Sequence, residues 1–286
     1  MSNKFIEFQE KVNTLNAQVA QGEMSEAERD ATLRQMKLQD ETWGDTWMIS
    51  PKGEWFRKAK GSSNWVRDYP IALIDPTTLP PIEQMNLHQI ARAVYDCTRC
   101  RLHETRTRGV PGEGPAPADI MLIGEAPGAN EDKQGRPFVG AAGKFLEELL
   151  DLAGYKREEV FITNVVKSRP PNNRDPEPDE IAACKDYLDR QIELVNPKVI
   201  VTLGRYSMYR YFPGASITKI HGQPKRAGNR LIVPMFHPAA ALHQPKWHSL
   251  IVEDFKKLPQ FVAEALAFSQ TKETIDPANT QQLSLF

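Results

Sequence analysis

The chain has 286 residues, 40% of them apolar, and a formal net charge of −1, which is enough to bury the core of a full α/β domain and a smaller unit. No apolar run approaches the ~20 residues of a membrane helix and the N-terminus lacks the apolar core of a signal peptide, so we expect a cytoplasmic protein with no membrane partner. The three cysteines, an odd number, argue against a disulfide framework and leave free thiols or metal ligands.

The first predicted elements are helices. Apolar residues recur near helical spacing over residues 5–19, and Ser25 followed by Glu28 forms a capping box that predicts a second helix to about Asp40. Residues 43–69 then carry four of the five tryptophans in short runs separated by turn signals. This pattern predicts a three-stranded meander whose aromatic side chains form a small core of their own.

A proline-rich stretch at residues 75–81 predicts a linker. We therefore divide the chain into an N-terminal region of unknown role (1–80), an α/β domain (81–268) and a flexible tail (269–286). The tail is polar over most of its length, which is typical of disordered segments.

Strand and helix patterns alternate after Met85. The predicted strands are 119–123, 160–166, 198–203 and 231–236. The predicted helices are 142–152, 178–193, 206–211 and 247–267. This alternation predicts an α/β fold with three layers, α/β/α, around a mostly parallel sheet. Polar residues follow every predicted strand, and because the carboxyl ends of parallel strands meet at one edge, they predict one site there.

The loop Gly124–Gly140 reads GEAPGANEDKQGRPFVG and opens directly after the first of these strands. Its glycines allow the backbone to approach a ligand closely, and its mixture of charged, proline and aromatic residues exceeds what a packed core needs. The stretch by itself also fits an ordinary loop and helix entry.

Charge is unevenly distributed along the domain. No acidic residue occurs between Glu193 and Glu253, a segment that contains the basic residues Lys198, Arg205, Arg210, Lys219, Lys225, Arg226, Arg230 and Lys246. The pattern predicts a positive surface that tracks nucleic-acid phosphates, with a solvated basic face as the alternative.

Four sequence blocks carry a resemblance to a known family. They are CTRC at 97–100, the loop at 124–140, TNVVKSRPPNNRDP at 163–176 and His237-Pro238. In this order, across the strand and helix alternation, they resemble the uracil-DNA glycosylase superfamily, and most closely its family 4, iron-sulfur type. The resemblance covers the chain from about Leu87 to Val262. It implies that 81–268 is a DNA repair enzyme that hydrolyses the N-glycosidic bond of uracil in DNA and leaves an abasic site.

The resemblance also implies a uracil pocket. An enzyme that acts on a base takes it out of the duplex and reads its Watson-Crick edge. Phe138 is the expected stacking wall, and the amide of Asn164 can donate to uracil O4 and accept from N3-H, whereas cytosine presents the opposite pattern. The full predicted uracil-binding set is Gly124, Ala126, Phe138 and Asn164.

His237 is the expected donor to O2 of the departing uracil, together with nearby backbone N-H groups. Ala126 stands where the best-known family of the superfamily has an aspartate, so no carboxylate occupies the usual water-activating place. Glu131 and Asn173 match family 4 positions proposed to arrange the water or shape the pocket, and Glu125 contributes through its side chain or backbone. We therefore expect a largely dissociative reaction.

The same resemblance implies a 4Fe-4S cluster. Cys97, Cys100 and Cys184 match three of its ligands, and Ser168 stands at the remaining position with the family spacing to Cys184. A serine oxygen is a harder ligand than thiolate. A cluster with one oxygen ligand, a three-iron or labile cluster, and no cluster all remain open. We favour a bound cluster, because the neighbouring thiols would otherwise have no explanation.

Further residues are predicted to contact uracil-containing DNA. Arg99, Arg101 and Arg169 are expected at phosphates, which position a duplex without reading its sequence. Leu242 is the candidate wedge that enters the helix when the base leaves, with packing against the following helix as the alternative.

The tail ends in Gln282, Leu283, Ser284, Leu285 and Phe286, which resemble the clamp-binding motif of bacterial replication and repair proteins. A partnership with the DNA sliding clamp follows as an expectation, and a chance match is the alternative. We expect a monomer. The alternative to an enzyme is a catalytically inactive DNA-binding or clamp-tethered scaffold of glycosylase descent.

Overall fold

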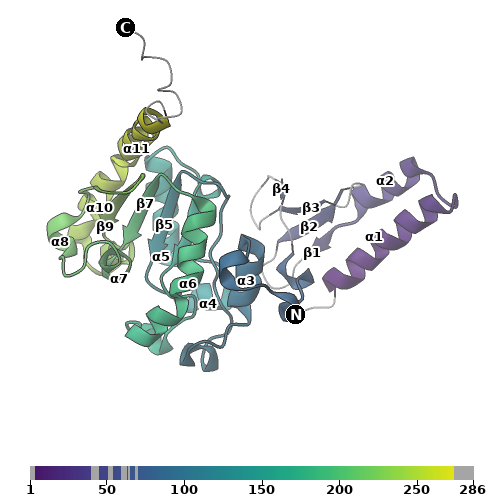
Figure 1. Cartoon of the computed structure of the whole chain (residues 1–286), viewed down its shortest axis with the longest axis horizontal. Helices are drawn as coiled ribbons and strands as arrows, with labels where there is room; N and C mark the ends of the chain where they lie inside the picture. The colour runs from purple at the N-terminus through teal and green to yellow at the C-terminus, as the bar shows by residue number, and fades with distance from the viewer. Residues whose placement is uncertain are drawn as a thin grey trace, which may run out of the picture. The chain divides into compact units, whose positions relative to one another are not determined.

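The computed structural model of the chain describes residues 4–39, 45–50, 54–58, 63, 65–67 and 70–273. The chain divides into two compact units, Met1–Ala93 and Val94–Phe286. This division falls within helix α3 (Leu87–Tyr95), and the proline-rich stretch contributes short 3-10 turns such as η2 (Pro76–Thr78). Figure 1 labels most of the helices and strands of both units. No helix among the described residues is long and apolar enough to cross a membrane.

In the described part of the N-terminal unit, two helices precede an antiparallel sheet of order β1-β2-β3-β4. The elements are α1 (Lys4–Ala20), α2 (Glu26–Gln35), β1 (Leu38–Gln39), β2 (Thr46–Ile49), β3 (Trp55–Lys58) and β4 (Val66–Arg67). The predicted capping box is confirmed, because Ser25 N donates to Glu28 Oε2 at 2.9 Å and Glu28 N donates to Ser25 Oγ at 3.3 Å.

Two predictions for this unit were wrong for one reason. Met36 adopts an extended conformation, and Leu38 then pairs with Trp47. The second helix therefore ends at Gln35 and not near Asp40, and the sheet gains a fourth strand. The predicted aromatic core is confirmed, and it includes α1: Phe5, Phe8, Trp47 and Trp55 are buried together.

The C-terminal unit contains a five-stranded sheet of order β6-β5-β7-β9-β8, parallel except for β8. Its strands are β5 (Ile120–Gly124), β6 (Phe161–Asn164), β7 (Val199–Leu203), β8 (Lys225–Ala227) and β9 (Arg230–Met235). Its helices after α3 are α4 (Ala129–Gln134), α5 (Ala141–Leu152), α6 (Pro178–Val195), α7 (Arg205–Tyr209), α8 (Ile217–Ile220), α9 (Ala239–His243), α10 (His248–Lys256) and α11 (Leu258–Glu273).

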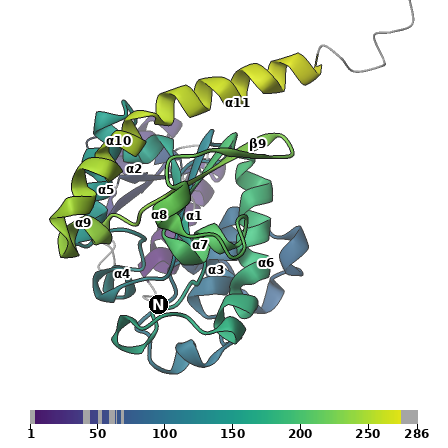
Figure 2. The same cartoon turned by 90° about the vertical axis from the view of Figure 1, so that its left-hand side faces the viewer.

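The sheet is covered on both faces, which confirms the predicted α/β architecture. One core joins the strands to α5, α10 and α11, and it includes Leu122, Val201, Val233, Leu146 and Phe255. On the other face, Ile200 and Ile232 lie with Ile192 of α6. Figure 2 shows α5 and α10 on one side and α6 on the other. Strands buried on both faces explain the continuous apolar runs in the sequence.

The end of the domain differs from the prediction. The single helix expected over 247–267 is two helices, because Pro259 in the first turn of α11 has no N-H to continue α10. The second helix continues to Glu273, so the first residues of the predicted tail are helical. Helix α3 and the short elements α4, α8, α9 and β8 were not predicted. The clamp-like residues Gln282 to Phe286 lie outside the described residues.

Candidate active site

The polar loops meet at the carboxyl edge of the sheet. From β5 the chain passes to β6 on one side and then to β7 on the other. Where the strand order reverses in this way, the loops diverge and leave a crevice. Gly124 and Asn164 end β5 and β6 directly opposite each other, and His237 follows β9.

Gly124, Phe138, Asn164 and His237 form what we call the strand-end site. A Cβ atom at position 124 would lie 2.7 Å from Phe138 Cζ and would also collide with Asn164 Oδ1, so only glycine permits this packing. Asn164 is 2% exposed, and its amide has no hydrogen-bond partner among the described residues. Its NH₂ group and its oxygen are therefore available to a ligand.

The protein fixes both the charge and the tautomer of His237. Ala239 N donates to His237 Nδ1 at 3.1 Å, so the ring proton belongs on Nε2, where it can be donated to a ligand. Burial lowers the pKa of His237 to about 4, against the opposing charge of Glu131. The imidazole is therefore neutral at pH 7, and it stacks on Phe138 with ring centroids 5.4 Å apart.

Glu131 organises the loop that carries Phe138. Its Oε1 accepts from Val139 N and Gly140 N, each at 2.8 Å, and its Oε2 accepts from Gly128 N at 3.1 Å. Of the two roles expected for Glu131, these contacts favour shaping the pocket over arranging a water, because both carboxylate oxygens already serve the backbone.

Arg157 and Glu113, which the sequence analysis missed, hold the other side of this loop. Phe138 has a left-handed backbone, with φ of 50°. Arg157 donates to Phe138 O at 3.0 Å and to Pro137 O, while its Nε donates to Glu113 Oε1 at 2.8 Å. Burial opposes ionisation of Glu113, but Arg157 and Arg136 outweigh it and lower its pKa to about 2. No sequence motif marks this pair, because its partners lie far apart in the chain.

Glu125 lies half-buried directly after β5. Burial raises its pKa to about 6, with a further rise from Asp175 and a partial offset from Arg205. Its side chain has no hydrogen bond among the described residues. Ala126, the next residue, is also partly exposed at this edge. Glu125 is thus a carboxyl group that changes its charge near neutral pH.

Two other predicted residues contact each other. Asn173 has a left-handed backbone and accepts from Arg169 Nε at 2.8 Å through its Oδ1. Leu242 lies on α9, which begins just after His237, and 52% of its surface is exposed. This exposure favours the wedge over the packing alternative.

Several basic side chains in the segment between Glu193 and Glu253 pair with carboxylates from other parts of the chain. Arg205, Arg210 and Arg226 pair with Asp175, Asp189 and Glu264 respectively. The predicted positive surface is therefore weaker than the local sequence implies, because carboxylates distant in the chain return to it. Arg99 and Arg101 are also paired, with Asp186 at 2.7 Å and Glu180 at 3.1 Å.

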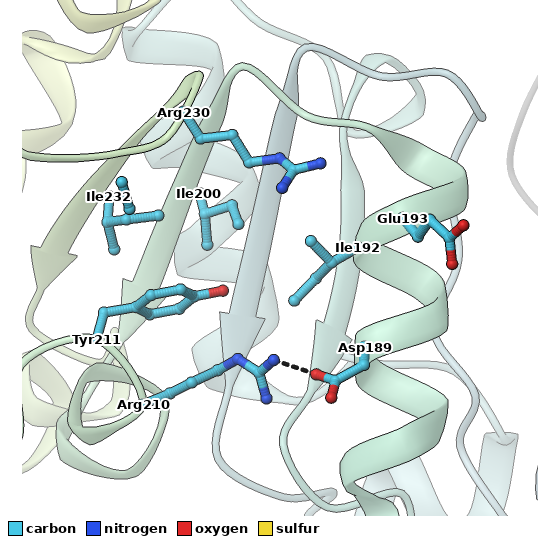
Figure 3. Close-up of a pocket in the computed structure, with 9 residues that line it drawn as sticks. Asp189, Ile192, Glu193, Ile200, Arg210, Tyr211, Arg230 and Ile232 are labelled. Atoms are coloured by element: carbon cyan, nitrogen blue, oxygen red, sulfur yellow. Dashed lines mark hydrogen bonds and ion pairs between the residues drawn. The ribbon is translucent and has the colours of Figure 1, made fainter. Parts of the chain in front are cut away.

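A cavity of about 340 Å³ lies elsewhere in this unit, between α6 and the sheet (Figure 3). Ile200 and Ile232 line it toward the amino ends of β7 and β9, and Arg210 reaches Asp189 across one side. It contains none of the predicted site residues. The strand-end site at the opposite edge therefore remains the candidate for chemistry.

Cys97, Cys100, Ser168 and Cys184, which we call the cysteine corner, come from three parts of the chain. Cys184 is buried on α6, and burial raises the pKa of its thiol to about 11. Ser168 is 3% exposed, and its Oγ accepts from Arg106 Nη1 at 2.5 Å. Among the described residues, no group of three or more His, Cys, Asp and Glu side chains has a metal-binding arrangement. Three thiols and one arginine-bound hydroxyl fit three ligand positions of a cluster better than four.

Lys167, another residue that the sequence analysis missed, connects the two regions. Its buried Nζ donates to Thr163 Oγ1 at 2.6 Å, Gln191 Oε1 at 2.7 Å and Asn164 O at 2.8 Å. Its backbone N donates to Cys184 Sγ at 3.3 Å. Burial lowers the pKa of this ammonium to about 7, while three acceptors match its three donors.

Comparison with known proteins identifies the family. The profile of the Uracil DNA glycosylase superfamily matches residues 111–266, more than half of the chain. The chain belongs to this superfamily. A "Type-4 uracil-DNA glycosylase" of Sulfurisphaera tokodaii is 51% identical over 201 residues, which cover 67% of this chain and 89% of that protein. One from Saccharolobus solfataricus is 50% identical, covering 61% and 86%, and one from Archaeoglobus fulgidus is 45% identical, covering 60% and 92%.

Membership in the uracil DNA glycosylase superfamily confirms the resemblance read from the four sequence blocks. The matched range contains the sheet, the strand-end site, Ser168 and Cys184, and it begins after Cys97 and Cys100. The N-terminal unit lies outside the match.

Proposed function

We propose that this member of the superfamily is a DNA repair glycosylase that hydrolyses the N-glycosidic bond of uracil in DNA and leaves an abasic site. One observation carries the proposal: the unpaired amide of Asn164 and the Nε2-H of a neutral His237 flank the ring of Phe138 at one sheet edge. The similarity to type-4 uracil-DNA glycosylases supports the same activity.

Recognition follows from the buried amide. A flipped uracil offers an acceptor at O4 and a donor at N3-H, which match the NH₂ and the oxygen of Asn164. Cytosine offers a donor and an acceptor in their place, so one of the two contacts becomes repulsive and leaves the amide unsatisfied. A site built around such hydrogen bonds discriminates more strongly than an apolar pocket. Gly124 and Ala126 complete the proposed set by leaving room for the base beside Phe138.

Catalysis in this proposal rests on the leaving group. Cleavage of the glycosidic bond places negative charge on uracil O2 and positive charge on the sugar. The neutral His237 donates its Nε2-H to O2, and donors of this kind, fixed before the reaction, are worth ~10² to 10³ in rate. A lowered pKa suits this role, because the imidazole stays a donor without carrying a buried charge.

Carboxylates have separate roles in the proposed reaction. Glu125, when ionised, stabilises the positive sugar and orients the attacking water, while Glu131 acts through the loop it holds. Asn173 completes the proposed catalytic set by orienting Arg169. Ala126 has no carboxylate that could deprotonate the attacking water. The N-glycosidic bond to uracil therefore breaks largely before the water attacks.

DNA contacts and the clamp partnership belong to the proposal as well. Arg99, Arg101 and Arg169 contact phosphates, and the exposed Leu242 enters the duplex where the base leaves. The tail residues Gln282, Leu283, Leu285 and Phe286 bind the sliding clamp, so that the tether raises the local concentration of enzyme at replicating DNA.

The cysteine corner would hold an iron-sulfur cluster. Its thiolates are the ligands that such clusters prefer. Such a cluster would fasten the segment that carries Cys97 and Cys100 to α6, which carries Cys184. Its role is therefore structural, and no step of the base removal passes through it.

Release of uracil from single-stranded and double-stranded oligonucleotides tests the function, with Asn164→Asp as the diagnostic variant. The wild-type protein should release uracil and ignore cytosine. The variant should lose most uracil release and shift its preference toward cytosine, because a carboxylate accepts from the cytosine amino group. DNA binding without any uracil release would instead support a scaffold of glycosylase descent.

A further inference from the structure

The three cysteines gather because one face of α6 meets the segment 97–106. Glu180, Cys184 and Tyr187 lie about one turn apart on that face. Glu180 accepts from Arg101, and Tyr187 lies under the guanidinium of Arg99, 5.2 Å from ring centroid to Cζ. The cysteine between these two anchors therefore faces the same segment.

Electrostatic interactions also link the three thiols. Cys97 contacts the hydroxyl of Tyr187, and both Cys97 and Cys100 act electrostatically on Cys184. Lys167 N donates to Cys184 Sγ at 3.3 Å, which places the chain just before Ser168 against the same sulfur. Three thiols and the hydroxyl of Ser168 thus come from segments that meet at one corner.

Arg106 determines what the fourth position can do. Its guanidinium donates to Ser168 Oγ at 2.5 Å, to Cys97 O at 2.6 Å and to Tyr95 O at 3.2 Å. Two of the three acceptors are backbone carbonyls, so the position of Arg106 does not depend on residue 168. The guanidinium occupies one lone pair of the only side-chain oxygen of Ser168.

A hydroxyl in this setting is a poor iron ligand. To bind iron well, serine must lose its proton, whereas thiols are far more acidic and match the softness of the cluster. The contact with Arg106 satisfies Ser168 as a neutral hydroxyl and gives the buried position a partner without any metal.

We propose that Ser168 is not a ligand and that the chain holds a three-iron cluster through Cys97, Cys100 and Cys184 alone, with the Arg106–Ser168 pair closing the fourth side. The inference rests on the iron-sulfur part of the proposed function and concerns the residues in which this chain departs from the family pattern. A three-iron cluster needs one thiolate for each iron and no fourth ligand.

The test compares the wild-type protein, Ser168→Ala and Ser168→Cys after anaerobic purification. We expect about three iron atoms per chain in the first two, and about four in Ser168→Cys, where a fourth thiolate becomes available. Electron paramagnetic resonance of the oxidised proteins provides a second readout. An oxidised three-iron cluster is paramagnetic, whereas the usual oxidised four-iron cluster is silent, so the signal should persist in Ser168→Ala and disappear in Ser168→Cys.

Ser207→Cys is the matched control. Ser207 is a buried serine, 1% exposed, on α7, where its Oγ donates to Gly204 O. A cysteine there should leave the iron content at the wild-type value, which shows that a new thiol matters only in the cysteine corner.

Four irons in the wild-type protein, loss of iron in Ser168→Ala, or no cluster in any variant would each overturn the proposal. Uracil release by the same preparations separates this inference from the function. A protein that releases uracil but holds a different cluster contradicts only this inference. A protein that holds the expected cluster but releases no uracil contradicts only the proposed glycosylase activity.

Discussion

The strand-end site and the cysteine corner belong to the same unit and are joined by a few residues after β6, yet the contacts that hold them differ. In the strand-end site, protein groups hold the reactive side chains in place: Ala239 N fixes the tautomer of His237, and Glu131 and Arg157 fix the backbone around Phe138. In the cysteine corner, the specific contacts are made by Arg106 and by the residues around the thiols.

This difference separates a preorganised site from one that needs a cofactor. A site whose geometry comes from its own chain depends on a few side chains, and removing one affects rate more than structure. A corner of thiols gains its main interactions when a cofactor binds. Because Lys167 contacts both regions, measurements of uracil release and of iron content should be made on the same variants.

The largest effect is expected from the strand-end site itself. His237→Ala removes the donor to the departing base, and Asn164→Ala removes the contacts that read it. Single-turnover excision should slow by ~10² to 10³ in each variant, because a preorganised donor of this kind is lost.

Iron content and melting temperature provide the control for these variants. Both should match the wild-type protein, since neither side chain takes part in the cysteine corner. A variant that kept its excision rate, or one that lost its iron, would contradict the separation of the two regions.

The next effect concerns the support of Phe138. Arg157→Met removes two contacts to loop carbonyls and leaves Glu113, whose side chain is 17% exposed, with Arg136 as its remaining guanidinium. We expect the free energy of unfolding, measured in urea, to fall by about 3 kcal/mol, as when one partner of a buried ion pair is removed. The value of kcat/KM should also fall by ~10-fold, because Phe138 is no longer held for stacking.

Lys156→Met is the matched control for Arg157→Met. Lys156 is the neighbouring residue, but 63% of its side chain is exposed, and its partner Asp151 is exposed as well. Its loss should leave the stability close to the wild-type value, because an exposed ion pair contributes little. Equal effects of the two substitutions would show that Arg157 does not support the loop.

The sequence predicted much of the fold because its signals are local. The four parallel strands are apolar runs buried on both faces, and the capping box at Ser25 depends on a residue three positions away. Prediction failed where partners are distant. The strand β1 exists because Leu38 pairs with Trp47, and the positive segment is neutralised by carboxylates such as Asp175 from outside it.

The site shows the same limit. The motifs predicted Phe138, Asn164 and His237 as functional residues, because the residues that contact the ligand are the ones that make up the motifs of the family. The groups that hold them, Arg157 and Lys167, follow no motif, and their importance is visible only in their contacts. The sequence alone showed that Ser168 departs from the family pattern of cluster ligands. Its hydrogen bond with Arg106 was found only in the structure.

A smaller effect is expected from pH. The pKa of Glu125 is about 6, so this carboxyl group is protonated below that pH and loses its stabilising charge. Excision should therefore rise between about pH 5 and pH 7, and Glu125→Gln should be slower but should lack this rise. His237, with a pKa of about 4, stays neutral throughout the range and adds no inflection of its own.

The raised pKa of Glu125 also predicts how the stability of the fold changes with pH. Because the pKa of Glu125 is raised in the folded state, its protonated form favours folding below the usual carboxyl pKa of 4.5, and this advantage is lost as the pH rises through about 6. Glu125→Gln should thus be more stable than the wild-type protein at pH 7 and closer to it at pH 4.5. An inflection in excision that survives in Glu125→Gln would assign it to another group.

The smallest effect on the two regions is expected from the tail. Deletion of Gln282 to Phe286 should abolish binding to the sliding clamp, measured by titration with purified clamp, because these apolar residues form the proposed motif. Excision from short oligonucleotides and iron content should stay within experimental error, since a tether changes encounter frequency and not the chemistry. Substituting Ser269 and Gln270, which precede the motif in the chain, by alanine is a control that should leave clamp binding intact. Equal clamp affinity of the deleted and full-length chains would remove the proposed partner, and altered excision from short oligonucleotides would mean that the tail acts on the strand-end site.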